Sequence, residues 1–508
     1  MRRLLFGSLV FVATASAAQA PRERDWSKAL AEDARALHDD IAANHPGTVN
    51  SLDPGFAANN DRQLAIALDR AKSARTYGDY FYPLRQYVAS FNDGHMSFGA
   101  FGNTPNDHWW PGFATHDDGT GAVVVATDDP GAPVPKGARL VGCDGMTAAR
   151  YAEATLGKMW GNWSLESQRR FRGFHQFLDE NSGLIPRARQ CTFRVGKTTK
   201  TIALTWRPLP IDRMVDLMDR LMRFQRNDFA SRMLVDGTRW FTMPSFNGSP
   251  GSNAVKSLPG MIETMADERT ALAAAPAIVL DLRGNGGGTS DWSRQIAAAL
   301  WGQGAIDALP PGPSVHVDWR ASPANLAAIA TAYGERRDSD GFSPDTDGWY
   351  RSVIAGLGGA IARKQALWRH VDFDGGAEQS TPAANVKPKA SPLPKLSTPV
   401  YVVTDFVCMS ACLDALDLWK ALGAVQIGRS TGADTLYMEV RQLRLPSGIG
   451  GVSMPMKVYR GRQRGSNQPA VPVHRYAGDI GDSKALEAWV ATLPERRRHG
   501  QRDTSGAK

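Results

Sequence analysis

The chain has 508 residues, of which 42% are hydrophobic and 22% charged, with 50 glycines and 31 prolines. This composition is typical of a folded globular protein, excludes disorder, collagen and coiled coil for most of the chain, and at this length suggests about three domains. The formal net charge is +8, but the basic residues concentrate at the two ends without an aromatic-interleaved stripe between them, so we do not expect nucleic-acid binding.

The first residues have the layout of a secretory signal peptide. Two arginines precede an apolar run from Leu4 to Ala15, and small residues follow. The run is too short to cross a bilayer, and no later stretch is long and apolar enough to do so. We place the cleavage after Ala17 or Ala18, which gives a signal peptide of residues 1–18 and predicts a secreted or periplasmic protein without a stable membrane span.

Residues 19–105 are predicted to form an N-terminal helical region. Apolar residues recur at three and four spacing from Trp26 to about Ser90, as in amphipathic helices that pack on another element. The polar, glycine-punctuated segment FNDGHMSFG follows, where we expect a loop or hairpin. This segment carries His95.

Residues 106–209 change to short strands and turns, which predicts a small β-rich module. Within it, GARLVGCDGMTAARYAE resembles the stretch of PDZ domains in which a strand and a turn precede a helix. The matching residues are Gly137, Leu140, Val141, Asp144 and Gly145. The alternative is an ordinary strand, turn and helix without that relationship.

Residues 210–508 are predicted to form an α/β core. A continuous apolar run from Ala277 to Leu280 indicates a buried strand, which a glycine-rich loop and an amphipathic helix follow. A second buried strand, VYVVTDF, leads to another helix, and AVQIGRS gives a third strand. Residues 304–396, rich in proline, glycine and charge, are predicted to be an insertion of loops around one helical stretch.

The glycine-rich loop after the first strand, DLRGNGGG, has two functional interpretations. A dinucleotide or phosphate loop fails on spacing, because Thr289 stands where the last glycine of Gly-x-Gly-x-x-Gly is needed and no Gly-Lys-Ser/Thr follows. Glycine also lets a backbone N–H point into a site, where it stabilises a developing oxyanion. Gly286 and Gly287 are the candidates, and a turn that lets helix and strand pack closely is the alternative.

Ser410 stands directly between the second buried strand and its helix. A nucleophilic serine is often placed on such a sharp turn, with the next N–H, here that of Ala411, at the start of the helix. A serine that only caps the helix is the alternative. The Gly-x-Ser-x-Gly of α/β-hydrolases is absent, so that fold is not favoured.

The two motifs together resemble the tail-specific and C-terminal processing serine peptidases. A strand ending in Asp-x-Arg-x-Asn-x-Gly-Gly and, beyond an insertion, a strand leading to Ser-Ala match that family, as does the order of helical region, PDZ-like module and α/β core. The resemblance implies a crotonase-like (ClpP/crotonase) peptidase core. It implies that Ser410 is the nucleophile and that Gly286 or Gly287, with Ala411, forms the oxyanion hole.

The resemblance also points to the general base. The processing branch carries a lysine in a Thr-x-Gly-Lys segment, but here the comparable text is STGADTLYMEV, with Asp434 in that place. An aspartate cannot replace a neutral lysine that takes the serine proton. The tricorn-like branch instead carries a histidine after Asp-Gly, which FNDGHMSFG supplies as His95, and histidine titrates near neutral pH.

A triad also needs an acid that orients the imidazole. Glu439 is the first candidate, because the processing branch has a site-supporting polar residue at a comparable place. Asp434 is the second, and Asp479 or Asp482 is the third. Each is also explained as an ordinary solvated carboxylate.

Four cysteines fall into two groups, Cys143 with Cys191 and Cys408 with Cys412. An exported chain permits disulfides, but four cysteines allow three full pairings and the sequence does not choose among them. Cys408 and Cys412 flank Ser410 and are interpreted as packing or disulfide residues. No zinc-peptidase, paired Cys-x-x-Cys or calcium-loop motif occurs, so we expect neither metal nor cofactor.

These observations predict an exported serine endopeptidase that hydrolyses peptide bonds through an acyl-enzyme. Ser410 attacks, His95 transfers the proton, and a peptide or unfolded protein is the substrate. Two alternatives remain: a non-catalytic peptide-binding protein on the same scaffold, and a serine esterase or amidase. The sequence does not determine the oligomeric state or the physiological substrate.

Overall fold

The computed structural model describes residues 24–101, 108–117, 121–126, 131–179, 183–221, 228–249, 251–310, 316–337, 344–370 and 396–495. The predicted signal peptide, residues 1–18, lies outside these residues. So does residue 106, the predicted start of the β-rich module.

Three helices form the predicted N-terminal helical region: α1 (Trp26–Asn44), α2 (Phe56–Ala71) and α3 (Tyr77–Ala89), with a 3₁₀ turn at Pro46–Val49. Asp25 caps α1 by accepting a hydrogen bond from the N–H of Lys28. The buried faces of these helices share a core with β17 (Tyr437–Arg444) and β18 (Gly450–Arg460). Helices near the N-terminus therefore pack on strands near the C-terminus.

The loop that carries His95 leads into a strand of that same sheet. β1 (Ser97–Ala100) pairs antiparallel with β18, and Ser97 lies opposite Ser453. The predicted loop or hairpin is thus a turn followed by a strand, whose partner comes from the far end of the chain.

The insertion is more ordered than the sequence indicated. Besides the predicted helix, α13 (Pro344–Ala362), it contains α12 (Pro323–Arg336), β13 (His316–Arg320) and β14 (Leu367–His370). β13 pairs with both β14 and β18, so the insertion extends the sheet of β1, β17 and β18. The prediction of loops around one helix was wrong here, because prolines at the first residue of α12 and of α13 start helices rather than break them.

The β-rich module contains a second sheet, in the order β3-β4-β5-β7-β8, with β6 paired to β5. Short helices cover one side, and the Cys143–Cys191 disulfide joins β5 to β7. Its elements are β2 (His108–Trp110), β3 (Ala114–Asp117), β4 (Ala122–Ala126), β5 (Arg139–Cys143), β6 (Met146–Thr147), α4 (Ala148–Ala152), a π turn (Glu153–Gly157), α5 (Lys158–Trp160), α6 (Glu166–Arg172), a 3₁₀ turn (Gly173–Phe177), β7 (Gln190–Val195), β8 (Thr198–Ala203) and β9 (Arg207–Leu209). The next helix, α7 (Ile211–Leu221), falls within the predicted core but packs on this module through Leu217.

The α/β core is built on a third sheet, in the order β10-β11-β12-β15-β16-β19, with parallel pairing from β11 onward. The three strands predicted from apolar runs are β12, β15 and β16. The elements are β10 (Ala230–Met233), β11 (Arg239–Thr242), α8 (Asn253–Asp267), α9 (Arg269–Ala274), β12 (Ile278–Asp281), α10 (Asp291–Trp301), α11 (Gln303–Asp307), β15 (Val400–Thr404), α14 (Ala411–Ala421), β16 (Val425–Gly428), β19 (His474–Arg475) and α15 (Ser483–Val490).

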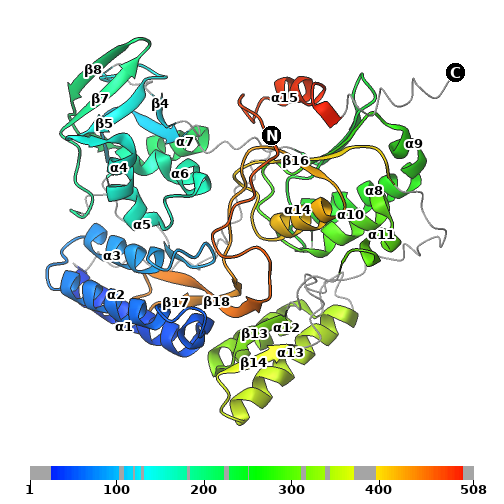
Figure 1. Ribbon diagram of the computed structural model, residues 1–508. Helices are drawn as coiled ribbons and strands as arrows, with labels where there is room; N and C mark the ends of the chain where they lie inside the picture. The colour runs from blue at the N-terminus through cyan, green and yellow to red at the C-terminus, as the bar shows by residue number, and fades with distance from the viewer. Residues whose placement is uncertain are drawn as a thin grey trace.

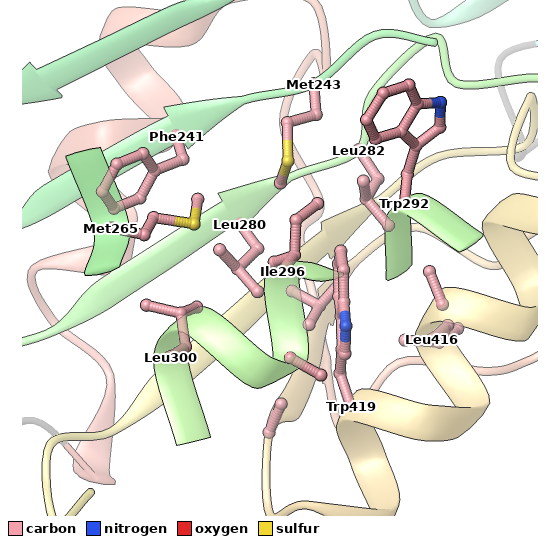
Figure 2. Close-up of a cluster of buried hydrophobic side chains, with 14 of the residues drawn as sticks. Phe241, Met243, Met265, Leu280, Leu282, Trp292, Ile296, Leu300, Leu416 and Trp419 are labelled. Atoms are coloured by element: carbon pink, nitrogen blue, oxygen red, sulfur yellow. The ribbon is translucent and has the colours of Figure 1, made fainter. Parts of the chain in front are cut away.

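Both faces of this sheet are buried, which explains why β12 and β15 are continuously apolar. On one face, Leu280 and Leu282 pack with Ile296 of α10 and Trp419 of α14, as Figure 2 shows. On the other face, Val279 and its neighbours pack against α15. Figure 1 shows α8, α10 and α14 grouped beside this sheet, with the β-rich module and helices α1–α3 on the other side of the molecule.

Candidate active site

Ser410 lies on the sharp turn that joins β15 to α14. Its backbone has φ 55° and ψ −127°, a conformation that costs energy for a residue with a side chain and that clusters at functional sites. Its side chain makes no capping hydrogen bond to α14. The half-buried hydroxyl is therefore not used as a helix cap, and the capping alternative is wrong.

The turn is fixed from both ends. A disulfide joins Cys408 to Cys412 across Ser410. The buried carboxylate of Asp405 accepts hydrogen bonds from the N–H of Val407 at 2.9 Å and from the N–H of Gly284 at 3.0 Å. Burial raises the pKa of Asp405 to about 6. Asp405 thus ties the serine turn to the glycine-rich loop on the neighbouring strand.

Gly287 packs directly against the serine turn. A Cβ atom at this position would lie 2.9 Å from Cβ of Ser410 and 3.0 Å from the nitrogen of Ala411, and φ is +98°. Only glycine fits at this spacing and this backbone conformation. A Cβ on Gly286 would meet nothing within 4 Å, so the two glycines predicted as alternatives have different surroundings.

The N–H groups beside Ser410 differ in their partners. Ala411 is the first residue of α14, where a backbone N–H has no acceptor within the helix. The N–H of Gly287, in contrast, donates to Oδ1 of Asn285 at 2.9 Å. The structure thus brings Gly287 and Ala411 next to the serine, and the N–H of Gly287 is held by Asn285.

The charged residues of DLRGNGGG anchor the loop. Arg283 forms a buried ion pair with Asp281 at 2.6 Å and also donates to the carbonyl oxygen of Ile480 at 2.7 Å. Asp281 accepts a further hydrogen bond from Nε1 of Trp240. These contacts fix the glycine loop to the sheet and to the segment before α15, and they explain why a charged pair stands at the end of a buried strand.

His95 follows α3 and is held by a buried carboxylate. Oδ1 of Asp93 accepts a hydrogen bond from the backbone N–H of His95 at 2.8 Å and lies 3.8 Å from Nδ1 of the imidazole. The hydroxyl of Thr435 donates to the same oxygen at 3.0 Å. Burial raises the pKa of Asp93, and the hydrogen bond from the backbone N–H of His95 opposes that shift.

The segment around Gly432 connects the histidine loop with the serine turn. Gly432 packs on the side chain of Met409, the residue before Ser410, and Gly94 lies against the carbonyl oxygen of Ala433. His95 and Ser410, far apart in the sequence, are therefore carried on loops that contact one short segment.

The acids predicted from the sequence have other partners. Glu439 of β17 pairs with Lys457 of β18 at 3.2 Å. Asp434 is buried in ion pairs with Arg462 and Arg464. Asp482 caps α15, and Asp479 accepts a hydrogen bond from the N–H of Gly481.

Asp93 is the carboxylate found beside His95, and it was missed in the sequence. It stands two residues before the histidine, in the segment already singled out. The sequence does not show that Asp93 is buried or that it accepts a hydrogen bond from Thr435.

The described residues contain neither a candidate metal site nor a candidate membrane span. No group of three or more histidine, cysteine, aspartate and glutamate side chains there is arranged to hold a metal ion. No helix there is long and apolar enough to cross a membrane.

Comparison with solved structures identifies the fold. Mature CPAF in complex with lactacystin is 14% identical, with a TM-score of 0.57 over 91% of this chain and 98% of that chain. A second structure of mature CPAF, also 14% identical, gives a TM-score of 0.58 over 91% and 96%. The chain therefore has the fold of CPAF.

A weaker similarity is found to a processing protease. The photosystem II D1 C-terminal processing protease is 13% identical over 89% of this chain and 93% of that chain, with a TM-score of 0.34, too low to support further inference. By its name, this neighbour is a C-terminal processing protease, the kind of protein that the two motifs resemble. By sequence alone, no known family profile and no curated protein matches the chain.

Proposed function

We propose that the protein is a serine peptidase in which Ser410 is the nucleophile and His95 the general base. The observation that carries the proposal is the conformation of Ser410: a positive φ, a hydroxyl not used for capping, and Gly287 packed against it. A strained turn that presents a free hydroxyl at a helix N-terminus suits a nucleophile. The fold shared with CPAF is consistent with a peptidase, and the experiment below separates peptide from ester hydrolysis.

In the proposed reaction, Oγ of Ser410 attacks the peptide carbonyl while Nε2 of His95 takes the serine proton and then gives it to the leaving amine. Asp93 faces the other nitrogen, Nδ1, so it orients the ring and stabilises the imidazolium. The distance of 3.8 Å is longer than a hydrogen bond, and such contacts often shorten when substrate binds. We therefore favour Asp93 over Glu439 as the triad acid.

The oxyanion is proposed to bind the N–H of Ala411 and a second N–H from the glycine loop, Gly286 or Gly287. Ala411 has the helix N-terminus behind it, which favours negative charge. For Gly287 to donate, its N–H must leave Oδ1 of Asn285. Gly286 is exposed, so its N–H is the alternative second donor to the oxyanion.

We also propose that the protein is exported and that residues 106–209 are a PDZ-like module that positions a peptide beside a crotonase-like core. Two disulfides, Cys143–Cys191 and Cys408–Cys412, support an oxidising compartment. The signal peptide proposed at residues 1–18 accounts for how the chain reaches it.

The test is cleavage of an unfolded protein by the wild-type chain and by Ser410→Ala. We expect reduced, alkylated casein to be cut by the wild type only, with new amino groups detected by fluorescamine. Cleavage of p-nitrophenyl acetate without cleavage of casein would instead favour an esterase. Binding of casein without turnover of either substrate would favour the non-catalytic alternative.

A further inference from the structure

Five charged side chains form a cluster beside α14, the helix that begins at the serine turn. Arg462 and Arg464, which follow β18, pair there with three carboxylates. Asp414 and Asp417 belong to α14, whereas Asp434 lies in the segment before β17. We call these five residues the arginine cluster. It joins two parts of the chain that are separate in the sequence.

The two arginines bridge α14 and Asp434. Nη2 of Arg462 donates to Oδ1 of Asp414 at 2.6 Å, and its Nη1 lies 3.4 Å from Oδ2 of Asp434. Arg464 donates from Nη2 to Oδ1 of Asp414 at 3.2 Å and from Nε to Oδ2 of Asp417 at 3.0 Å. Its Nη1 donates to Oδ1 of Asp434. One planar guanidinium therefore serves three carboxylates, which the single ammonium group of a lysine cannot do in the same geometry.

Much of the arginine cluster is removed from solvent. The side chains of Arg462 and Arg464 are 11% and 8% exposed, and that of Asp434 is 3% exposed. Burial alone would lower the pKa of Arg462, but the charges of Asp414 and Asp434 raise it above its usual value. A buried ion pair holds its members together, because separating them would leave an uncompensated charge. The cluster therefore fixes α14 relative to the segment of Asp434.

At one end, the arginine cluster reaches the serine turn. Asp414 lies in the first turn of α14, and its backbone N–H donates to the carbonyl oxygen of Ser410 at 3.3 Å. Oδ2 of Asp414 also accepts a hydrogen bond from the hydroxyl of Ser290, just after the glycine-rich loop, at 2.9 Å. A shift of Asp414 would therefore displace the turn that carries Ser410.

At the other end, the arginine cluster reaches the histidine loop. Asp434 is followed directly by Thr435, whose hydroxyl donates to Oδ1 of Asp93 at 3.0 Å. The carbonyl oxygen of Asp434 accepts a hydrogen bond from the N–H of Asn467 at 2.7 Å. The side chain of Asn467 in turn donates to the carbonyl oxygen of Asn92 at 2.8 Å. Two sets of hydrogen bonds thus connect Asp434 with the loop that carries the histidine.

We propose that Arg464, together with Arg462, is a positioning residue that sets the placement of Ser410 relative to His95 by joining α14 to the segment of Asp434. Both guanidinium groups are occupied by carboxylates, so they act through these partners rather than on a substrate. The inference rests on the proposed function, because the alignment of the two side chains matters only if a proton passes between them. It also gives Asp434 a role other than that of triad acid.

The test is a double-mutant cycle on the rate at which a fluorophosphonate labels Ser410 in the full chain. Arg464→Met alone should slow labelling by about tenfold or more, because a misaligned base takes the serine proton less efficiently. In the His95→Ala background, the same substitution should change the rate by less than about twofold, since no base is left to be aligned. A merely structural role would instead slow labelling by the same factor in both backgrounds.

The matched control is Arg441→Met. The side chain of Arg441 is 8% exposed, as is that of Arg464, but it pairs with Asp40 and so joins β17 to α1. This control should change the labelling rate of folded protein by less than about twofold. Circular dichroism checks that the variants fold. If Arg464→Met does not fold, Arg464→Lys takes its place in the cycle, because lysine keeps the charge but not the planar donors, and it should slow labelling only where His95 is present.

Three results would overturn the positioning role while leaving the proposed function intact. These are labelling of the Arg464 variant at the wild-type rate, equal slowing with and without His95, and equal slowing by the Arg441 control. A wild-type protein that takes no label at Ser410 would instead contradict the proposed function itself, and this inference with it.

Discussion

A Cβ atom on Gly287 would lie 2.9 Å from Cβ of Ser410. This closeness predicts that Gly287→Ala pushes the serine turn out of place and slows acylation by at least about 100-fold, because small displacements of a nucleophile are expensive. The rate of labelling by a fluorophosphonate measures this. Gly286→Ala, whose added Cβ meets nothing within 4 Å, should slow labelling much less. Equal labelling rates for Gly287→Ala and the wild type would contradict the close packing of Gly287 against Ser410.

The identity of the triad acid can be decided by exchanging carboxylates for amides. Asp93→Asn should reduce the labelling rate about 100-fold or more, because the imidazole loses the carboxylate that stabilises its protonated form. Glu439→Gln should have little effect on the rate, since Glu439 pairs with Lys457. If Glu439→Gln slowed labelling and Asp93→Asn did not, in variants whose circular dichroism is unchanged, Glu439 would be the triad acid instead.

The Cys408–Cys412 disulfide is predicted to hold Ser410 in its strained conformation. Replacing both cysteines by alanine should slow labelling about tenfold or more, because the turn between them relaxes toward ordinary backbone angles. Replacing Cys143 and Cys191 by alanine is the control. It removes a disulfide of the β-rich module, which typically costs about 2–5 kcal/mol of stability, and should leave the rate of labelling of folded protein unchanged. Equal slowing in both double variants would contradict this role.

Asp405 predicts a pH dependence of stability. Burial raises its pKa to about 6, above the value of about 3.9 in an unfolded chain. The folded state holds the proton more tightly, so this group's contribution to stability is complete below about pH 4 and is lost as the pH rises through about 6, by about 3 kcal/mol in total. Calorimetric melting temperatures of wild type and Asp405→Asn at pH 4 to 7 measure it. The melting temperature of Asp405→Asn should rise relative to that of the wild type as the pH increases from 4 to 7. A difference in melting temperature that does not change with pH would contradict the raised pKa of Asp405.

The elements that could be predicted from the sequence are those whose own residues show that they are buried. β12 and β15 are apolar runs buried on both faces, and the helix that starts after Ser410 follows directly. The sequence predicts only a loop or hairpin where β1 lies, because the partner strand of β1, β18, lies at the other end of the chain. In the insertion, the many turn-forming residues favoured a prediction of loops, so α12, β13 and β14 were not predicted.

The candidate site, like the fold, could be predicted only where the local sequence carries the signal. The sequence indicates Ser410, Gly287 and Ala411 as candidates because they stand where a strand ends or a helix begins, and the structure brings the three together. The proposed acid, Asp93, could not be predicted, because the surroundings of a carboxylate depend on residues far along the chain. Asp93 is fixed by Thr435, and Glu439 is occupied by Lys457 across two strands.

Covalent labelling of Ser410 tests the central claim most directly. Native protein treated with a fluorophosphonate should carry one label, which peptide mass spectrometry places on Ser410, and the label should be absent in Ser410→Ala and in heat-denatured protein. His95→Ala should slow labelling by about 100-fold or more, as expected for loss of a general base. Native, folded protein that takes no label at Ser410 would contradict the account.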